Sequence, residues 1–286
     1  MKILLAVMIF CSIFFVSIEN ADAQVGFNPE YLGNASAPAK PGFALKYFLS
    51  YFNQQGISAH DFEMALEPQL FITGFSGDPS KDQIQFVAHL PFGYRRQNNN
   101  AGGSSSVFGI GSLAFNVESF WHLVDNDTTE VWFDNAVSSS FPTATIDNGV
   151  ALGGRNYSIG WFQECYIRHR NFIVSIMPMA VQWNFRDEKS HILNGLSMNI
   201  ANGSVGYAIN DSVSLGVDFG LLLGRVGGAE DRQGNSLGTT VRAYMGPAAA
   251  FSFTHNISLQ VGSAIDFATK RTQRGQGIFF ALWHHF

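Results

Sequence analysis

The stretch VSLGVDFGLLL at residues 213–223 decides the fold class. Apolar side chains occupy every second position of it: Val213, Leu215, Val217, Phe219, Leu221 and Leu223. Small or polar residues, such as Gly216 and Asp218, stand between most of them. A period of two is typical of a β-strand with one apolar face. The same period recurs at residues 43–51, 257–267 and 278–286.

Extending this pattern along the chain predicts twelve strands, each long enough to cross a membrane at a tilt. Their ranges are 43–53, 64–75, 82–93, 108–121, 129–140, 157–168, 171–185, 196–209, 212–224, 239–253, 256–268 and 277–286. Pro68 and Pro178 each remove a ladder donor, so we expect bulges or breaks at these two positions.

The predicted connections alternate in length, since every odd-numbered connection is longer than its even-numbered neighbours. Long outer loops and short periplasmic turns are typical of a bacterial outer-membrane barrel. Asn210-Asp211 and His255-Asn256 supply turn residues at two of the short connections. The sequence therefore predicts an all-β fold, a transmembrane antiparallel up-and-down β-barrel of about 12 strands.

Composition agrees with a sheet that meets lipid on one face and water on the other. Of the 286 residues, 46% are hydrophobic and only 14% are charged, and 27 are Phe. Soluble domains carry about 25% charged residues, and disordered chains have few aromatic residues. No apolar run long enough for a membrane helix occurs beyond the N-terminus. Because backbone polar groups in lipid must be paired within the protein, a closed barrel is the remaining solution.

The N-terminus has the features of a secretory signal peptide. Lys2 precedes the almost wholly apolar stretch 3–18, and Ala21-Asp22-Ala23 forms an A-x-A cleavage site. We therefore expect a signal peptide at 1–23, an N-terminal extension or small plug at 24–42, and the barrel at 43–286. Cys165 is then the one remaining cysteine, which excludes an intrachain disulfide.

On the barrel hypothesis, apolar positions face lipid and the alternate positions line the lumen. The candidate lining residues are Lys46, Phe48, His89, Glu118, Glu164, Arg168, Asp218, Arg242, Tyr244, Asp266, Phe279 and Trp283. Ionisable residues inside a membrane protein are functional candidates, although such a set also suits a structural network that fills a narrow barrel. If a three-residue loop places Ser252 opposite Asn256, Arg242 faces Asp266 and the two form an ion pair.

The lining set favours a small apolar or aromatic solute. No row of Arg and Lys appears, as a pore for anionic sugars or phosphate would show, whereas Phe48, Phe279 and Trp283 offer aromatic surface. No H-E-x-x-H or G-x-S-x-G motif and no phosphate-binding loop occurs. We expect no catalytic residues, no metal and no cofactor. The formal net charge of −5 without a basic stripe argues against nucleic-acid binding.

The C-terminal strand resembles the terminal signal that the barrel-assembly machinery of Gram-negative bacteria reads. Its residues here are Phe280, Leu282, His284 and Phe286. The resemblance implies insertion into the outer membrane of a Gram-negative bacterium after cleavage near Ala23. The expected partners are this machinery during insertion, outer-membrane lipid and lipopolysaccharide, and a small-molecule solute.

Three short motifs are similar to recurring stretches of one family. They are VAHLPFG at 87–93, Gly109-Ile110-Gly111-Ser112 after a polar loop, and Gly246-Pro247 in a late strand. They resemble the outer-membrane barrels of the meta-pathway phenol-degradation family, and the resemblance would cover most of the chain beyond the signal. It implies a role in uptake of hydrophobic or aromatic compounds. In that family the position of Ser112 is usually acidic.

Two functions remain open at this point. The first is an outer-membrane channel or transporter for small hydrophobic or aromatic solutes. The alternative is a non-conducting structural or adhesion barrel that presents its extracellular loops.

Overall fold

The computed structural model describes residues 41–54, 59–98, 103–147, 150–152, 157–184, 195–226, 238–271 and 274–286. The expected signal peptide at 1–23 lies outside the described residues, as does the expected extension at 24–42 apart from Pro41 and Gly42. No stretch among the described residues forms a helix long and apolar enough to cross a bilayer.

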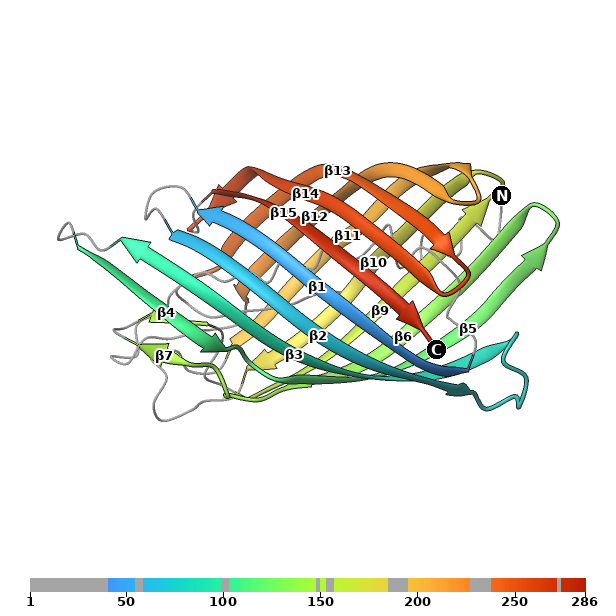
Figure 1. Ribbon diagram of the computed structural model, residues 1–286, viewed down its shortest axis with the longest axis horizontal. Coiled ribbons are helices and arrows are strands. Elements are labelled where there is room, and N and C mark those ends of the chain that lie inside the picture. The colour runs from blue at the N-terminus through green and yellow to red at the C-terminus, as the bar shows by residue number, and fades with distance from the viewer. Residues whose placement is uncertain are drawn as a thin grey trace.

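Twelve long antiparallel strands form a closed barrel, which confirms the predicted fold class (Figure 1). They are β1 (Gly42–Gln54), β2 (Ala59–Thr73), β3 (Asp82–Asn98), β5 (Ala114–Asn126), β6 (Thr129–Ser140), β9 (Ser158–His169), β10 (Phe172–Asn184), β11 (Gly195–Asn210), β12 (Val213–Val226), β13 (Thr240–Thr254), β14 (Ile257–Lys270) and β15 (Gly275–His285). β1 closes the ring on β15, with Ala44 opposite His285 at one end and Gln54 opposite Gly275 at the other.

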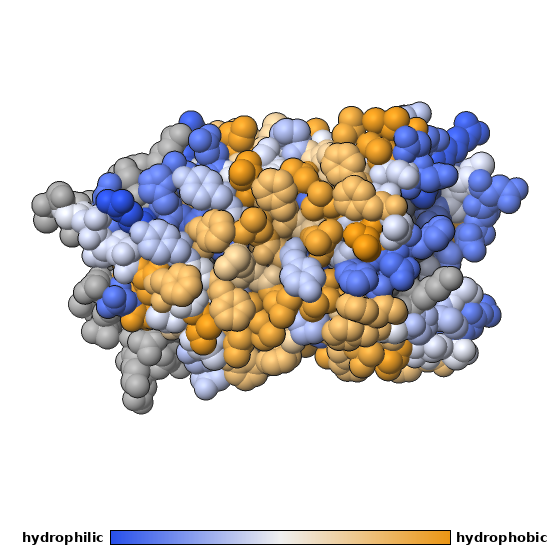
Figure 2. Space-filling view, in the orientation of Figure 1, coloured by the Kyte–Doolittle hydropathy of each residue, from blue (hydrophilic) through white to orange (hydrophobic). Residues whose placement is uncertain are grey.

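Exposure alternates along the strands, as the sequence pattern predicts. In β15 the buried residues are Gly275, Gly277, Phe279, Ala281 and Trp283, whereas Ile278, Phe280 and Leu282 between them are exposed. The exposed apolar side chains form a band around the middle of the barrel, with hydrophilic residues at both ends (Figure 2). This band is the surface that meets hydrocarbon in an outer-membrane barrel.

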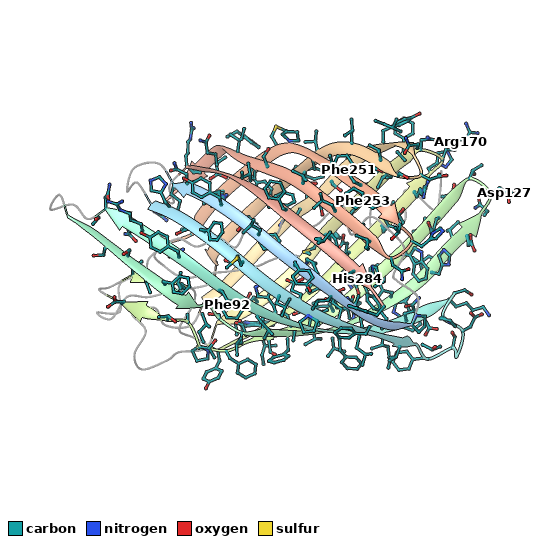
Figure 3. All side chains as sticks on the ribbon, in the orientation of Figure 1. Phe92, Asp127, Arg170, Phe251, Phe253 and His284 are labelled. Atoms are coloured by element: carbon teal, nitrogen blue, oxygen red, sulfur yellow. The ribbon has the colours of Figure 1, made fainter. Side chains whose placement is uncertain are left out.

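Two-residue turns join strands at one end of the barrel. They lie at 127–128, 170–171, 211–212 and 255–256, and Asp127 and Arg170 mark this turn end in Figure 3. The Asn210 side chain accepts a hydrogen bond from the Ser212 N–H at 2.9 Å, and Asn126 does the same for the Thr128 N–H at 3.2 Å. These bonds are the Asx turns that Asn favours.

The predicted alternation of connection lengths is wrong at the first pair. β2 begins at Ala59, so the outer connection spans only 55–58, whereas the turn at 74–81 is longer. The predicted strand 64–75 left His60, Asp61 and Glu63 in the preceding connection. In the structure Asp61 lies on the buried face and the exposed Phe62 and Met64 alternate with it, which is what a polar inner face allows.

The predicted strand 108–121 is divided in two. β4 (Ser104–Ile110) pairs with the outer part of β3, and β5 pairs with residues 82–89 of the same strand. Residues 111–113 separate β4 from β5. A Cβ on Gly111 would lie 2.8 Å from Pro91 Cγ.

The connection after β6 carries the short β7 (Ile146–Asp147) and β8 (Val150–Ala151). Thr143 and Thr145 hold it against the end of β4 and the segment between β4 and β5. Their Oγ1 atoms accept hydrogen bonds from the Leu113 N–H at 2.9 Å and the Ile110 N–H at 3.0 Å.

The two strand prolines behave differently. A register shift between Ile176 and Met179 in the pairing of β10 with β9 confirms the irregularity predicted at Pro178. At Pro68 the predicted irregularity is a break in the β2–β3 ladder, whereas β2 keeps one register with β1 through this residue. Pro68 has no β3 partner in that ladder, so the missing N–H interrupts pairing without a bulge.

Candidate functional site: the inner wall of the barrel

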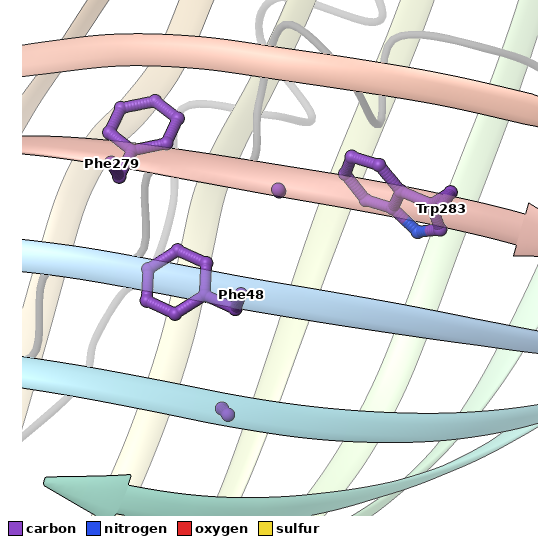
Figure 4. Close-up of a cluster of buried hydrophobic side chains, with 5 residues drawn as sticks. Phe48, Phe279 and Trp283 are labelled. Atoms are coloured by element: carbon purple, nitrogen blue, oxygen red, sulfur yellow. The ribbon is translucent and has the colours of Figure 1, made fainter.

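A cluster of buried aromatic side chains covers the inner face of β15, β1 and β2. It consists of Phe48, Ala65, Phe279, Ala281 and Trp283 (Figure 4). Its three rings were candidates from the sequence. The Phe279 ring occupies the space beside Gly262 that a Cβ would fill, and the Phe52 ring occupies the corresponding space beside Gly275 and Gly277. Glycines on neighbouring strands therefore let these rings pack against the wall.

Lys46 joins this cluster to a buried ion network. Its side chain is 1% exposed, its Nζ lies 2.5 Å from Glu67 Oε2, and it stands over the Trp283 ring at 5.0 Å from the centroid. Glu67 lies directly opposite Lys46 in the β1–β2 ladder. Glu67 Oε1 in turn lies 2.6 Å from His89 Nδ1. Three strands thus contribute one connected group, in which the charge of Lys46 is compensated.

Arg242 forms the ion pair expected with Asp266, but through a different register. Arg242 Nε donates to Asp266 Oδ1 at 2.6 Å, with side chains 4% and 0% exposed. The predicted register is wrong, because Arg242 lies opposite Thr269 and Asp266 opposite Tyr244. The turn accounts for the difference, because it pairs Thr254 with Ile257 and not Ser252 with Asn256, and the two one-residue register shifts further along the ladder cancel each other. The long Arg side chain spans this offset and lies over the Phe52 ring at 4.6 Å.

Carboxylates and hydroxyls line the wall formed by β6, β9, β10, β11 and β12. Asp134 lies opposite Glu164, Ser175 donates a hydrogen bond from Oγ to Glu164 Oε1, and Ser175 lies opposite Ser204. Ser204 lies opposite Asp218. We call these five residues the acidic row. Glu118 extends the acidic surface onto β5, where it lies opposite Ala136, two residues from Asp134.

The remaining predicted residues occupy distinct places. His89 and Glu118 are half-buried, Tyr244 is buried, and Arg168 is exposed near the turn end of β9, opposite Glu130. Phe280, Leu282 and Phe286 of the expected insertion signal are exposed on the outer face, and His284 is half-buried. Their recognition by assembly machinery stays a prediction.

Several inner-wall residues escaped the sequence analysis. Arg95 pairs with Asp61 through Nε–Oδ1 at 2.6 Å and Nη2–Oδ2 at 3.1 Å, and both side chains are buried. The early start of β2 hid this pair, because Asp61 was assigned to a loop. Asp134, Ser175 and Ser204 were also missed. Asp134 stands between Trp132 and Ala136, an alternation that marks it as an inward polar position.

Metal binding finds no support in the part of the chain that the structure describes, where no group of three or more His, Cys, Asp or Glu side chains is placed to hold an ion.

Comparison of the sequence with family models finds a match that includes most of the inner-wall residues. Residues 70–282 match the family model described as "Putative MetA-pathway of phenol degradation". The chain belongs to this family. The match spans β3 to β14 completely and includes the inner residues His89, Asp218 and Phe279. No curated protein matches the chain.

Solved structures show the same fold for this family member. The crystal structure of the COG4313 outer membrane channel from Pseudomonas putida F1 is similar with a TM-score of 0.73 and 14% identity, covering 92% of this chain and all of that one (100%). The β domain of the Bordetella autotransporter BrkA has a TM-score of 0.50 and 10% identity, over 86% of this chain and 99% of that one. The transport unit of the Escherichia coli autotransporter AIDA-I has a TM-score of 0.51 and 9% identity, over 86% and 91%. The chain therefore has an outer-membrane barrel fold.

Proposed function

We propose that the protein is an outer-membrane channel for small hydrophobic or aromatic solutes. The observation that carries this proposal is the buried aromatic cluster on the inner face of β15, β1 and β2. Aromatic rings that face inward lie on the side that does not meet lipid, so lipid contact does not explain their presence. Rings of this kind attract apolar and aromatic solutes by offset and edge-to-face packing.

The charges near these rings are compensated within the wall. Lys46 is paired with Glu67 and Arg242 with Asp266, each within hydrogen-bond distance. A wall that carries paired charges and aromatic rings presents little net field to an uncharged solute, whereas rows of unpaired Arg and Lys would retain anions. The family description, which refers to phenol degradation, and the channel named among the similar structures both support this chemistry.

Flux measurements on proteoliposomes test the proposal. We expect vesicles containing the protein to take up a neutral glucoside that carries an aromatic ring, such as benzyl glucoside, faster than a sugar of similar mass that carries none. Phe279→Ala and Trp283→Ala together should reduce the aromatic flux severalfold and leave the sugar flux unchanged. Phe267→Ala is the matched control, because this exposed ring on the neighbouring strand faces outward. Equal rates for both solutes in the parent protein would contradict the proposed solute class.

The rival function is a non-conducting barrel that presents its outer loops. The structured connection that Thr143 and Thr145 fasten to β4 favours it, since ordered loops suit recognition. Vesicles that show no flux of either solute above protein-free controls would favour this rival.

The route to the membrane belongs to the same proposal. We propose cleavage near Ala23 and recognition of Phe280, Leu282, His284 and Phe286 during insertion. N-terminal sequencing of the mature protein tests the first, and a Phe286→Ser variant with reduced outer-membrane yield tests the second.

A further inference from the structure

The acidic row crosses five neighbouring strands on the inner wall without a break. Each step is a direct cross-strand neighbour or a hydrogen bond: Asp134 to Glu164, Glu164 to Ser175, Ser175 to Ser204, and Ser204 to Asp218. Asp134, Ser175, Ser204 and Asp218 are all buried. Such a row runs across the strands, so a solute that moves along the barrel must pass it.

Part of the row lacks hydrogen-bond partners within the protein. Asp218 is 1% exposed, and neither of its carboxylate oxygens has a partner. Ser204 Oγ and Asp134 Oδ1 are likewise buried without a partner. A buried carboxylate without a donor or a cation is strongly unfavourable. The unsatisfied oxygens of Asp218 lie three strands from Glu164 and four from Asp134, so they are a separate observation that this wall would accept a positive or hydrogen-donating group.

Few Lys or Arg side chains are described on this half of the barrel. Among the side chains that the structure describes on β5, β6, β9, β10, β11 and β12, Arg168 is the one Lys or Arg, and it is exposed near the turn end. In the ring order of the strands, β9 and β10 lie six places from β15 and β1. The middle of the acidic row, on β9 and β10, therefore lies on the wall opposite the aromatic cluster (Figure 1), and its ends on β12 and β6 lie three strands from β15 and β2.

We propose that the acidic row makes this channel selective for cations, and that its organic solutes are positively charged or neutral aromatic compounds rather than aromatic carboxylates. This inference rests on the proposed channel function. Carboxylates that line a pore favour cations electrostatically. An aromatic solute with an ammonium group would place its ring against Phe48, Phe279 and Trp283 and its charge towards Asp218. Attraction between cations and aromatic faces acts in the same direction.

The first test measures the ratio of potassium to chloride permeability in planar bilayers under a KCl gradient. We expect a ratio above one for the parent protein. In the Asp134→Asn/Asp218→Asn variant the ratio should fall at least roughly threefold, because the variant removes two of the carboxyl groups that favour cations along this wall. The Asp127→Asn/Asp211→Asn variant is the matched control, since it removes the same charge from exposed turns outside the barrel wall.

The second test compares two organic probes of similar size in vesicle-uptake assays. Benzylammonium should enter at least roughly threefold faster than benzoate through the parent protein, and this difference should shrink in the Asp134→Asn/Asp218→Asn variant.

The outcomes separate the two levels of the proposal. Absence of any conductance would overturn the channel function and this inference with it. Conductance with a potassium-to-chloride ratio at or below one in the parent protein would overturn the inference alone, whether or not the variants fold. A ratio that falls equally in the control variant would also contradict a specific role of the row.

Discussion

Replacement of Arg242 by Met should destabilise the barrel by about 3–5 kcal/mol, because it leaves a buried carboxylate without its cation. The Nε–Oδ1 distance is 2.6 Å, and the Asp266 side chain is 0% exposed. The Gly275 N–H still donates to Asp266 Oδ2 at 2.7 Å in the variant, so the carboxylate keeps one partner. Loss of the contact between the guanidinium and the Phe52 ring at 4.6 Å adds about 0.5–2 kcal/mol.

A double-mutant cycle isolates the ion pair. Asp266→Asn retains an oxygen that accepts the Gly275 N–H, and in combination with Arg242→Met it removes both charges. The double variant should therefore be at least about 1 kcal/mol more stable than the sum of the two single effects predicts. Urea-dependent tryptophan fluorescence in lipid vesicles measures each free energy of unfolding by linear extrapolation.

The turn end supplies the control for this cycle. Lys81 Nζ lies 2.9 Å from Asp78 Oδ2, with side chains 70% and 40% exposed. Exposed pairs contribute little, so Lys81→Met should leave the unfolding midpoint unchanged. A decrease in the free energy of unfolding of less than about 1 kcal/mol for Arg242→Met would contradict a stabilising buried pair. Simple additivity of the effects of the two substitutions on that free energy would contradict it as well.

Two further predictions concern the outer surface and the turn end. Val217 is an exposed residue, the fifth of the 14 in β12, so Val217→Arg should cost up to about 2–4 kcal/mol in vesicles, and an unchanged free energy of unfolding would place this face away from hydrocarbon. Hydrogen bonds from Lys81 and Ser80 lower the pKa of the exposed Asp78 carboxyl from 3.8 to about 2. Its stabilising effect is then complete above the unfolded pKa of 3.8 and is lost as the pH falls through about 2, which carbon-13 NMR titration of this carboxyl checks against an Asp78→Asn spectrum.

The period of two predicted both strand type and side-chain direction, because neighbouring residues of a strand face opposite sides. Lys46, Phe48 and Phe279 were identified as inward residues in this way, and all three are buried. The alternation is strict here because lipid and lumen impose opposite preferences on the two faces. The predicted strand 64–75 begins five residues after the observed start of β2 at Ala59, in a stretch where the inner face carries the polar residues Asp61 and Glu63.

Register was harder to predict than direction. The turn at 255–256 pairs Thr254 with Ile257, so Arg242 lies opposite Thr269, three residues from Asp266, and the two bulges between these points cancel each other. The ion pair survives because the guanidinium reaches across the offset. A correctly predicted contact between two side chains, one of them long, is therefore weak evidence that the predicted strand register is also correct.

The acidic row illustrates why a site that runs across strands is difficult to read from sequence. Its members come from five strands, and each is a single polar residue in an otherwise ordinary alternation. A one-residue slip in any pairing would turn one side chain to the lipid face. The turns at 170–171 and 211–212 constrain the registers of β9 with β10 and of β11 with β12, since short turns fix register. The other two pairings join strands that long connections separate, so only the apolar outer face determines them. Substitutions that weaken the lipid-facing alternation of β6 or β11 should therefore disturb cation preference without touching a carboxylate.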